Sequence, residues 1–578
     1  MTLSHSQTAR PAPTSAWILL AIAGIAAVLL RVIALASDPY AGLDWSSGLL
    51  TDEGFYIHNA RNAVLFGHAI TDGFNNMFLS PLLHLVQVAV FRLAGVGSVQ
   101  ARSISVGCGL AAVGVLYCGL RRAFDVRTAL AGAAFLGLDH VFVLFNRMAL
   151  MDTPAALLAV CSFYAFVRAA GAGRARAGLW FALCGLFIGA AVVTRGLCLY
   201  LVAAPAAGIA ALGPGAPRKA LSIAAGALLV LAWYIAAWYL PHAAEIRHMN
   251  AYYLHHQILP GSLLHLAQNL YHGLLGDRRG IVPYLFRHTP VLWVLAATAG
   301  AAALLRSASA IRASVQDGER GNPSAGALRF LAAWFCAGMA ALAAVSYSPG
   351  RYSVTLWPAL CGLAATAFFA PGVPQQLWRD RGSAGLIALA AIAWVAAYHA
   401  DEALFGREGP IRQMLLYLLP SLAAASVLLW KMRGYAVPAP GAWSRWMVFG
   451  AAALWIIVDA AWLADWAGHI RYAQRDLSLW LGSHVPARAA ALGDVAPGLC
   501  MDNRLKAVSV IPGLCNDADP LARFRGEGTV IAIMDGVHQE KWWVRTYPGV
   551  VKAARRIRLA RVIKWDIGIY PVQERRSP

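Results

Sequence analysis

Runs of about 20 apolar residues recur along most of this 578-residue chain and limit the folds that it can adopt. An α-helix of that length spans the hydrocarbon core of a bilayer and satisfies its own backbone hydrogen bonds there. Hydrophobic residues make up 59% of the chain and charged residues only 13%. Soluble domains have roughly 45–50% and 25%. The sequence therefore predicts a polytopic α-helical membrane protein.

The basic residues indicate an orientation for these helices. The net charge is +20, but Lys and Arg occur in short clusters between the apolar runs and form no single patch. This spacing is typical of the cytoplasmic loops of a multi-pass protein, so no nucleic-acid partner is expected. We predict about 13 spans, at 16–36, 101–120, 126–146, 153–169, 178–194, 196–212, 218–240, 284–305, 328–347, 353–370, 384–400, 411–431 and 443–464.

Residues 82–96 decide how these spans alternate across the membrane. The segment is apolar but short, and it contains His84, Gln87 and Arg92. As a flat interfacial helix it places every later basic cluster on the same side as the N-terminus. Two long loops, 37–100 and 241–283, then lie on the outer face.

The remaining organisation follows from this topology. Residues 1–15 are the predicted cytoplasmic N-terminus, 16–464 the membrane domain and 465–578 an extracytoplasmic domain. The last segment has short apolar runs at 529–534 and 566–570 between Pro, Gly and charged residues, which predicts a small α/β domain. Its two cysteines, Cys500 and Cys515, are expected to form a disulfide on an oxidising face, with two buried thiols as the alternative.

Several polar residues that are distant in sequence meet at the predicted outer face. Asp52 and Glu53 belong to the first outer loop, within TDEGFY. Asp152 opens the span after NRMALMDTP, Arg195 lies in a turn between two spans, and Arg351 and Tyr352 open another span. Each also has a structural interpretation. Interfacial arginines often extend to lipid headgroups, and an acidic residue such as Asp152 stabilises a helix N-terminus. The Asp139-His140 pair would be a buried polar defect of the third span.

Two acidic and two basic sites on one face suit group transfer from a lipid-linked phosphate. Arginine binds a departing phosphate with two hydrogen bonds and stabilises its developing charge. A carboxylate within hydrogen-bond reach can remove the proton of an acceptor hydroxyl. No Walker or Rossmann glycine motif occurs in the sequence, so a soluble nucleotide donor is not indicated.

In their order and spacing these motifs resemble the GT-C superfamily of membrane glycosyltransferases. The bacterial branch of the lipid A aminoarabinose transferase and relatives of the protein O-mannosyltransferases is the most similar. The resemblance rests on TDEGFY at 51–56, SPLL at 80–83, Arg102, RMALMDTP at 147–154, TRG at 194–196 and Arg351-Tyr352. It implies a polyprenyl-phosphate sugar donor, an envelope acceptor and inverting transfer at the outer face of a bacterial inner membrane.

The resemblance also implies roles by position. Asp52 would be the base, Glu53 would orient or bind the acceptor, and Asp152 would be a second acidic site residue. Arg195, Arg351 and Tyr352 would hold the donor phosphate. Further candidates for substrate binding are Tyr56, Arg61 and Arg147. SPLL stands where relatives often have Lys-Pro-Pro or His-Pro, so a basic or histidine contact is missing there. This difference bears on the identity of the acceptor more than on the chemistry.

No cofactor is required by these motifs, and a divalent metal is left open. The 241–283 loop is rich in histidine, but the spacing matches no metal-ligand motif, so interfacial histidines are expected. The alternative function is a transporter or flippase of polyprenyl-linked sugars, which predicts charges at the membrane midplane and broken spans in paired halves. A non-catalytic scaffold would not need arginines beside carboxylates. The charges at one face favour the enzyme.

Overall fold

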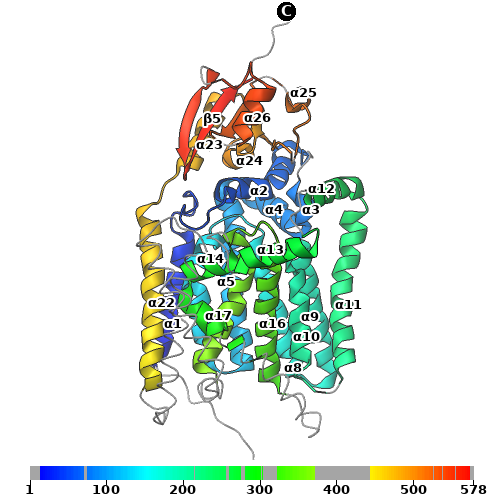
Figure 1. Cartoon of the computed structure of the whole chain (residues 1–578), viewed down its shortest axis with the longest axis vertical. Helices are drawn as coiled ribbons and strands as arrows, with labels where there is room; N and C mark the ends of the chain where they lie inside the picture. Colours follow the sequence, from blue (N-terminus) through cyan, green and yellow to red (C-terminus); the bar gives the residue numbers. More distant parts are fainter. Residues whose placement is uncertain are drawn as a thin grey trace, which may run out of the picture.

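The computed structural model describes residues 14–370 and 443–572, apart from gaps at 71–74, 214, 256–259, 275–279, 298, 301–302, 304–321, 514, 525, 527, 537 and 553–554. A bundle of long helices forms one end of the molecule and a small sheet domain the other (Figure 1). The predicted spans at 384–400 and 411–431 lie outside the described residues.

The described residues contain seven helices long and apolar enough to cross a membrane, or eight if one bent pair forms a single span. The predicted helical class is therefore confirmed. The long helices are α5 (Ser98–Ala123), α8 (Asp152–Ala170), α9 (Arg174–Thr194), α11 (Ala216–Tyr234) with η2 (Ile235–Tyr239), α16 (Pro323–Ala344), η3 (Gly350–Leu356) with α17 (Trp357–Phe369), and α22 (Trp443–Gly468), which begins the apolar stretch Gly450–His484. The first helix, α1 (Thr14–Val32), corresponds to the predicted span at 16–36.

Three predicted spans have interruptions. The span at 126–146 consists of α6 (Val126–Leu138) and α7 (His140–Asn146), which meet at 57°. The span at 196–212 is a 3-10 segment, η1 (Gly196–Val202), followed by the short helix α10 (Ala203–Ile209). In the span at 284–305 the helix α14 (Ile281–His288) ends at His288.

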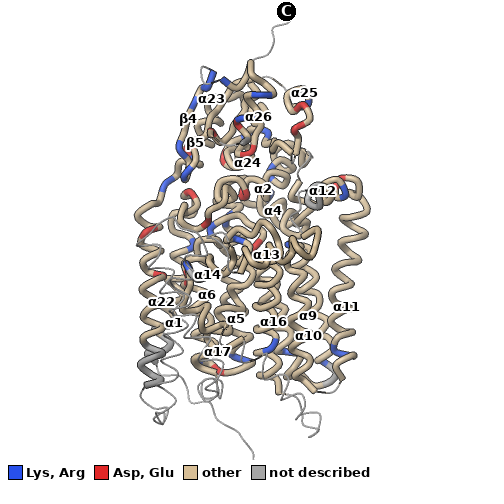
Figure 2. The backbone as a smooth tube through the Cα atoms, viewed as in Figure 1, with Lys and Arg blue, Asp and Glu red and all other residues tan. Residues whose placement is uncertain are grey.

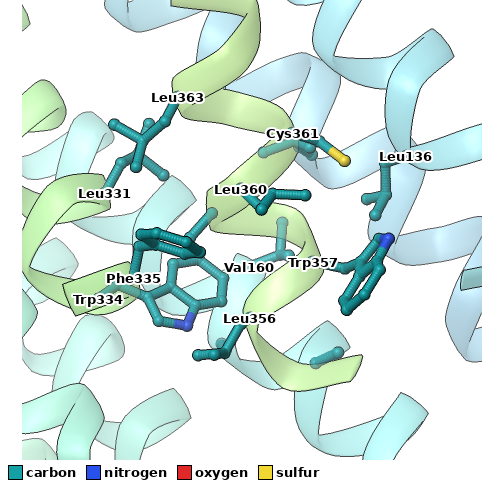
Figure 3. Packing of buried hydrophobic residues seen from close by; sticks show 14 of the residues in the cluster. Leu136, Val160, Leu331, Trp334, Phe335, Leu356, Trp357, Leu360, Cys361 and Leu363 are labelled. Carbon is teal, nitrogen blue, oxygen red and sulfur yellow. The ribbon is translucent and has the colours of Figure 1, made fainter. Parts of the chain in front are cut away.

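The core of the bundle lies around α17, where the side chains of α16 and α17 pack together (Figure 3). Trp334 and Trp357 are fully buried, and the Trp334 indole donates a hydrogen bond to the carbonyl oxygen of Thr355 (3.1 Å). Because an indole N–H must find an acceptor when it is buried, this bond fixes the segment before α17 against α16. That segment is η3, which carries Arg351 and Tyr352.

The segment 37–100 is mainly helical. It contains α2 (Gly48–Phe66), α3 (Asn76–Leu79) and α4 (Pro81–Ala94). Asp52 and Glu53 belong to α2, a helix within the segment that the sequence assigns to the first outer loop. The expected helix at 82–96 is present as α4, with Pro81 in its first turn, where a missing N–H costs nothing. Figure 1 shows α2 and α4 between the bundle and the sheet domain, together with α12 (Ala243–His255) and α13 (Leu263–Leu274).

The sheet domain has five strands in the order β2-β1-β3-β5-β4. The strands β1, β2 and β3 are parallel, and β5 runs antiparallel to β3 and β4. The strands expected at 529–534 and 566–570 are β3 and β5. The elements are α23 (Ala473–His484), β1 (Ala490–Gly493), α24 (Ala496–Leu499), β2 (Lys506–Ser509), α25 (Pro520–Phe524), β3 (Val530–Met534), α26 (His538–Thr546), β4 (Arg558–Val562) and β5 (Trp565–Pro571).

The sheet domain rests on α2. Leu50 of α2 is part of the hydrophobic core of the domain, and α24 approaches α2 so closely that a Cβ atom at Gly54 would clash with the backbone of Gly498. The expected disulfide is absent: Cys500 and Cys515 are separate buried thiols. Cys500 lies in the domain core and Cys515 against Phe55, so each cysteine fills an apolar position of its own.

Candidate active site

The first half of the candidate site is the pair Asp52 and Arg351. Arg351 Nε lies 2.5 Å from Asp52 Oδ2, and both side chains are more than nine-tenths buried. Arg351 also donates from Nη1 to Ser46 Oγ (3.1 Å), and the same atom lies 3.9 Å from Asp44 Oδ2. The start of α2 and the start of η3 are thereby held together by charge.

The second half is the pair Asp152 and Arg195. Asp152 is the first residue of α8, and Arg195 directly follows α9, so both lie at the same ends of two packed helices. Arg195 Nε lies 2.9 Å from Asp152 Oδ1, and Asp152 is fully buried. Each carboxylate of the site thus has one guanidinium partner.

Tyr352 joins the two pairs. Its ring lies 4.1 Å from the guanidinium carbon of Arg195 and 5.0 Å from that of Arg351. Stacking of both guanidinium groups on one ring is a cation–π arrangement that keeps the two positive charges close despite their repulsion. The result is a continuous series from Asp52 through Arg351, Tyr352 and Arg195 to Asp152, which we call the carboxylate–arginine cluster.

The environment of the cluster changes the acidity of α2 side chains. Burial raises the pKa of Asp52 to about 6, and the charges of Asp152 and Asp44 act in the same direction, while the Arg351 guanidinium opposes them. Burial, followed by the charge of Asp52, also raises the pKa of Tyr56 above its ordinary value, so this phenol stays protonated beside the cluster. A carboxyl group with a pKa near the working pH is suited to accept a proton.

Glu53 has different partners from its neighbour Asp52. Arg102 of α5 donates to both of its oxygens (Nε to Oε1, 2.8 Å; Nη2 to Oε2, 2.6 Å), and the Ala149 N–H donates to Oε1 (2.7 Å). Arg102 also donates to the carbonyl oxygens of Leu35 and Ser37. Glu53 therefore ties α2 to α5 and to the turn that precedes Asp152.

Two of the predicted substrate-binding residues lie outside the cluster. Arg61 donates to the carbonyl oxygen of Asn503 (2.7 Å) and so connects α2 to the sheet domain. Arg147 donates to carbonyl oxygens at the end of α1, including those of Ile33 (2.6 Å) and Ala34 (2.7 Å). Arg61 thus joins α2 to the sheet domain, and Arg147 joins the end of α7 to the end of α1. Tyr56 does lie beside the cluster, close enough for Asp52, Arg351 and Arg195 to influence its acidity.

The comparisons with known proteins concern one segment of the chain and its overall fold. Residues 79–232 match the family model described as dolichyl-phosphate-mannose-protein mannosyltransferase. The fold matches the crystal structure of ArnT from Cupriavidus metallidurans in the apo state, with a TM-score of 0.57 and 16% identity over 96% of this chain and 98% of that one. The chain therefore shares the fold of ArnT and contains a segment that matches this mannosyltransferase family model.

Two further structures show similarity to this chain. One is the same ArnT bound to undecaprenyl phosphate, with a TM-score of 0.52, 16% identity and coverage of 96% and 98%. The other is the archaeal oligosaccharyltransferase AglB from Archaeoglobus fulgidus, with a TM-score of 0.47, 11% identity and coverage of 90% of this chain and 69% of that one. No curated protein sequence matches the chain at a significant level.

Sequence motifs do not identify every residue of the candidate site. Asp44 and Ser46, which contact Arg351, lie before α2 in a stretch that matches no motif. Tyr347, whose ring lies 5.7 Å from the Arg351 guanidinium carbon, was also unmarked. A polar residue close to a predicted arginine in space but distant in sequence gives no local signal.

The carboxylates of the cluster are held by guanidinium groups. Within the described part of the chain, side chains spaced as metal ligands occur instead at Asp139, His140 and Asp459, inside the bundle. Of the loop histidines, His242 packs against Phe78 and Trp238. Chemically, the cluster offers a buried carboxylate that can accept a proton beside two guanidinium groups that can hold an anion.

Proposed function

We propose that this protein is a GT-C glycosyltransferase that moves a sugar from a polyprenyl-phosphate-linked donor to an acceptor of the bacterial envelope by an inverting displacement. The observation that carries the proposal is the spacing of Asp52 beside Arg351 and Arg195, two buried arginines stacked on one tyrosine. The binding of undecaprenyl phosphate by the structurally similar ArnT supports this class of donor.

In the proposed reaction Asp52 removes the proton of the acceptor hydroxyl. The hydroxyl oxygen forms a bond to the anomeric carbon, and the bond from that carbon to the phosphate oxygen breaks. Polyprenyl phosphate leaves with the electron pair of this bond, and its negative charge is stabilised by Arg195 and Arg351. Attack on the side opposite the leaving phosphate inverts the anomeric configuration.

The other predicted residues have supporting roles. Asp152 keeps Arg195 in place through its ion pair, and Tyr352 supports both guanidinium groups. Glu53 positions α2 through Arg102, and this positions Asp52 on the same helix. Tyr56, protonated beside the cluster, is a donor available to a substrate oxygen.

We place the cluster at the outer face of the inner membrane. Basic residues end α5 and α8 at Arg121, Arg122 and Arg168, and Figure 2 shows Lys and Arg at the end of the bundle opposite the sheet domain. Since cytoplasmic ends of membrane helices are enriched in Lys and Arg, that end is the cytoplasmic one. In this topology the chain has about 13 spans, residues 1–15 are cytoplasmic, and the domain from about residue 465 is extracytoplasmic.

The test uses the full chain in proteoliposomes with undecaprenyl-phosphate-linked sugars and an envelope fraction as the acceptor pool. Wild type is expected to release undecaprenyl phosphate and to glycosylate an acceptor, both measured by mass spectrometry. Arg195→Gln is expected to lower turnover by about 10²-fold because it removes charge from the leaving phosphate. Arg471→Gln, an exposed arginine, is the matched control.

Movement of intact sugar-lipid across the bilayer without cleavage would favour the alternative, a transporter. The bent pair α6 and α7 favours that alternative, since transporters use broken helices. Its polar residues, however, are distinct from the carboxylate–arginine cluster.

A further inference from the structure

A second polar cluster lies inside the bundle, apart from the candidate active site. Asp139 occupies the break between α6 and α7, and His140 begins α7. Asp459 comes from α22 and His288 from the end of α14, and all four side chains are buried. Titratable groups buried among membrane helices are costly unless they are paired or bind something, so this cluster needs a physical explanation.

The two histidines form a short chain with Asp459. His140 Nδ1 lies 2.6 Å from Asp459 Oδ1, and His140 Nε2 lies 3.1 Å from His288 Nδ1. The indole of Trp462 stacks on the His140 ring at 5.4 Å and 5°, which fixes the plane of the imidazole. The imidazole of His140 is therefore held beside the Asp459 carboxylate.

Both carboxylates have an oxygen without a hydrogen-bond donor. Asp139 Oδ1 accepts from the N–H groups of Val141 and Phe142 and from the indole of Trp357 (2.6 Å). Asp139 Oδ2 and Asp459 Oδ2 are buried and accept no hydrogen bond from any residue that the structure describes. An unsatisfied buried acceptor costs about 1–3 kcal/mol, and more when it is charged.

The nearest arginine on α1 does not satisfy these oxygens. Arg31 donates to the carbonyl oxygens of Ala27 and Gly137 and to Asn146 Oδ1. A divalent cation bound by both carboxylates would instead neutralise their charge.

Asp139, His140 and Asp459 each offer one ligand atom, and these atoms all lie within 4.8 Å of one another. Zinc lies about 2.0–2.2 Å from nitrogen and oxygen ligands, which places those ligands roughly 3–4 Å apart. We propose that these three residues bind a divalent transition-metal ion with the preferences of zinc, and that His288 completes the site. Two imidazoles with two carboxylates form a ligand set that favours Zn²⁺ over Mg²⁺ or Ca²⁺.

The ion has a structural role. It joins the break between α6 and α7 to α14 and α22, and Asp139 also holds Trp357, which directly follows the segment that carries Arg351 and Tyr352. The metal therefore stabilises the packing behind the carboxylate–arginine cluster without contacting it. This inference does not depend on the proposed function, because metal content and stability are measured without sugar transfer.

The test begins with the full chain purified in detergent without chelators. Wild type is expected to carry about one zinc ion per chain, measured by inductively coupled plasma mass spectrometry. Asp459→Asn and His140→Gln are expected to lose at least about tenfold of the bound metal, since each removes a ligand. Asp465→Asn, on the same helix but outside the cluster, and Asp52→Asn, in the active site, are expected to keep it.

Two further measurements apply even where a variant does not fold. Chelation of wild type is expected to lower its thermal unfolding temperature, and Zn²⁺ to restore it. Co²⁺ added to the chelated protein is expected to give the visible absorption of a four-coordinate nitrogen and oxygen site. Wild type that contains no metal, takes up no Co²⁺ and does not respond to chelation overturns the proposal, as does Asp459→Asn with full metal content.

Discussion

At the scale of single residues, the adjacent acids Asp52 and Glu53 differ in the groups that they contact. Asp52 contacts one arginine at 2.5 Å, and its pKa is raised to about 6 mainly by burial. Glu53 accepts two hydrogen bonds from Arg102 and one from the backbone at Ala149. The first arrangement leaves a carboxylate that can exchange a proton, and the second uses a carboxylate to hold helices together.

The pKa of Asp52 predicts the pH dependence of transfer. Asp52 accepts a proton only when it is ionised, so the rate is expected to fall as the pH drops through about 6. Arg351 lowers this pKa, and Arg351→Gln is therefore expected to move the acid limb of kcat/KM to higher pH. Two results would contradict the role of Asp52. One is a wild-type kcat/KM that falls only near pH 4, and the other is a pH profile that Arg351→Gln does not shift.

The contacts of Glu53 predict a stability defect. Glu53→Gln leaves Arg102 buried without a charged partner, and breaking a buried ion pair costs about 3–5 kcal/mol. We expect a clear fall in the thermal unfolding temperature of the purified protein, and no comparable fall for Asp476→Asn, at an exposed position of α23. If Glu53→Gln unfolds at the wild-type temperature but raises the KM for acceptor, Glu53 binds the acceptor instead.

At this scale the sequence predicts which residues form the cluster but not the separate role of each. The motifs point to Asp52, Asp152, Arg195, Arg351 and Tyr352, and the structure brings these five together. The contacts of Arg61 and Arg147 with distant backbone depend on how the chain folds back on itself, so the same motifs could not separate them from the cluster.

At the scale of elements, α2 is the helix that the sequence does not predict. Most of its residues are buried, because bundle and sheet domain enclose it, so its sequence shows no single apolar face. The long apolar helices, in contrast, follow directly from their length and composition. The break at Asp139 is visible in the sequence only as a polar pair inside an apolar run.

The first residue of α2 is a sensitive position. A Cβ atom at Gly48 would lie 2.5 Å from Arg351 Nη1 and 2.9 Å from Asp52 Oδ2. Gly48→Ala is therefore expected to displace both side chains and to lower turnover by about 10²-fold, because a small misplacement of catalytic groups is costly. Gly107→Ala in α5, where the added methyl group meets nothing within 4 Å, is the control. Equal turnover of Gly48→Ala and wild type would show that Arg351 is not needed in this position.

At the scale of the whole molecule, the sheet domain covers the helix that carries Asp52. The Arg61 guanidinium and the Asn62 amide donate to carbonyl oxygens of Asn503 and Ala507, and Leu50 lies in the core of the domain. The two hydrogen bonds and the shared core couple the domain to the candidate site. Sequence composition predicts the domain. Its position on α2 depends on contacts between residues that are more than 400 positions apart in the sequence.

This docking predicts the behaviour of Arg61→Ala. Loss of the buried guanidinium leaves the Asn503 carbonyl oxygen without its donor, which costs about 1–3 kcal/mol. We expect faster release of the sheet domain in limited proteolysis and lower transfer activity. Arg504→Ala, an exposed arginine beside the same contact, is expected to behave as wild type. Unchanged proteolysis of Arg61→Ala would mean that other contacts hold the domain.

The most direct test of the account compares donor binding and turnover of Asp52→Asn with those of wild type, using an undecaprenyl-phosphate-linked sugar. The amide retains the size of the side chain but cannot act as a base, so turnover is expected to fall by about 10²–10⁴-fold while the donor still binds. Asp476→Asn, at an exposed position of α23, should transfer sugar at the wild-type rate. Unchanged turnover of Asp52→Asn would contradict its assignment as the base.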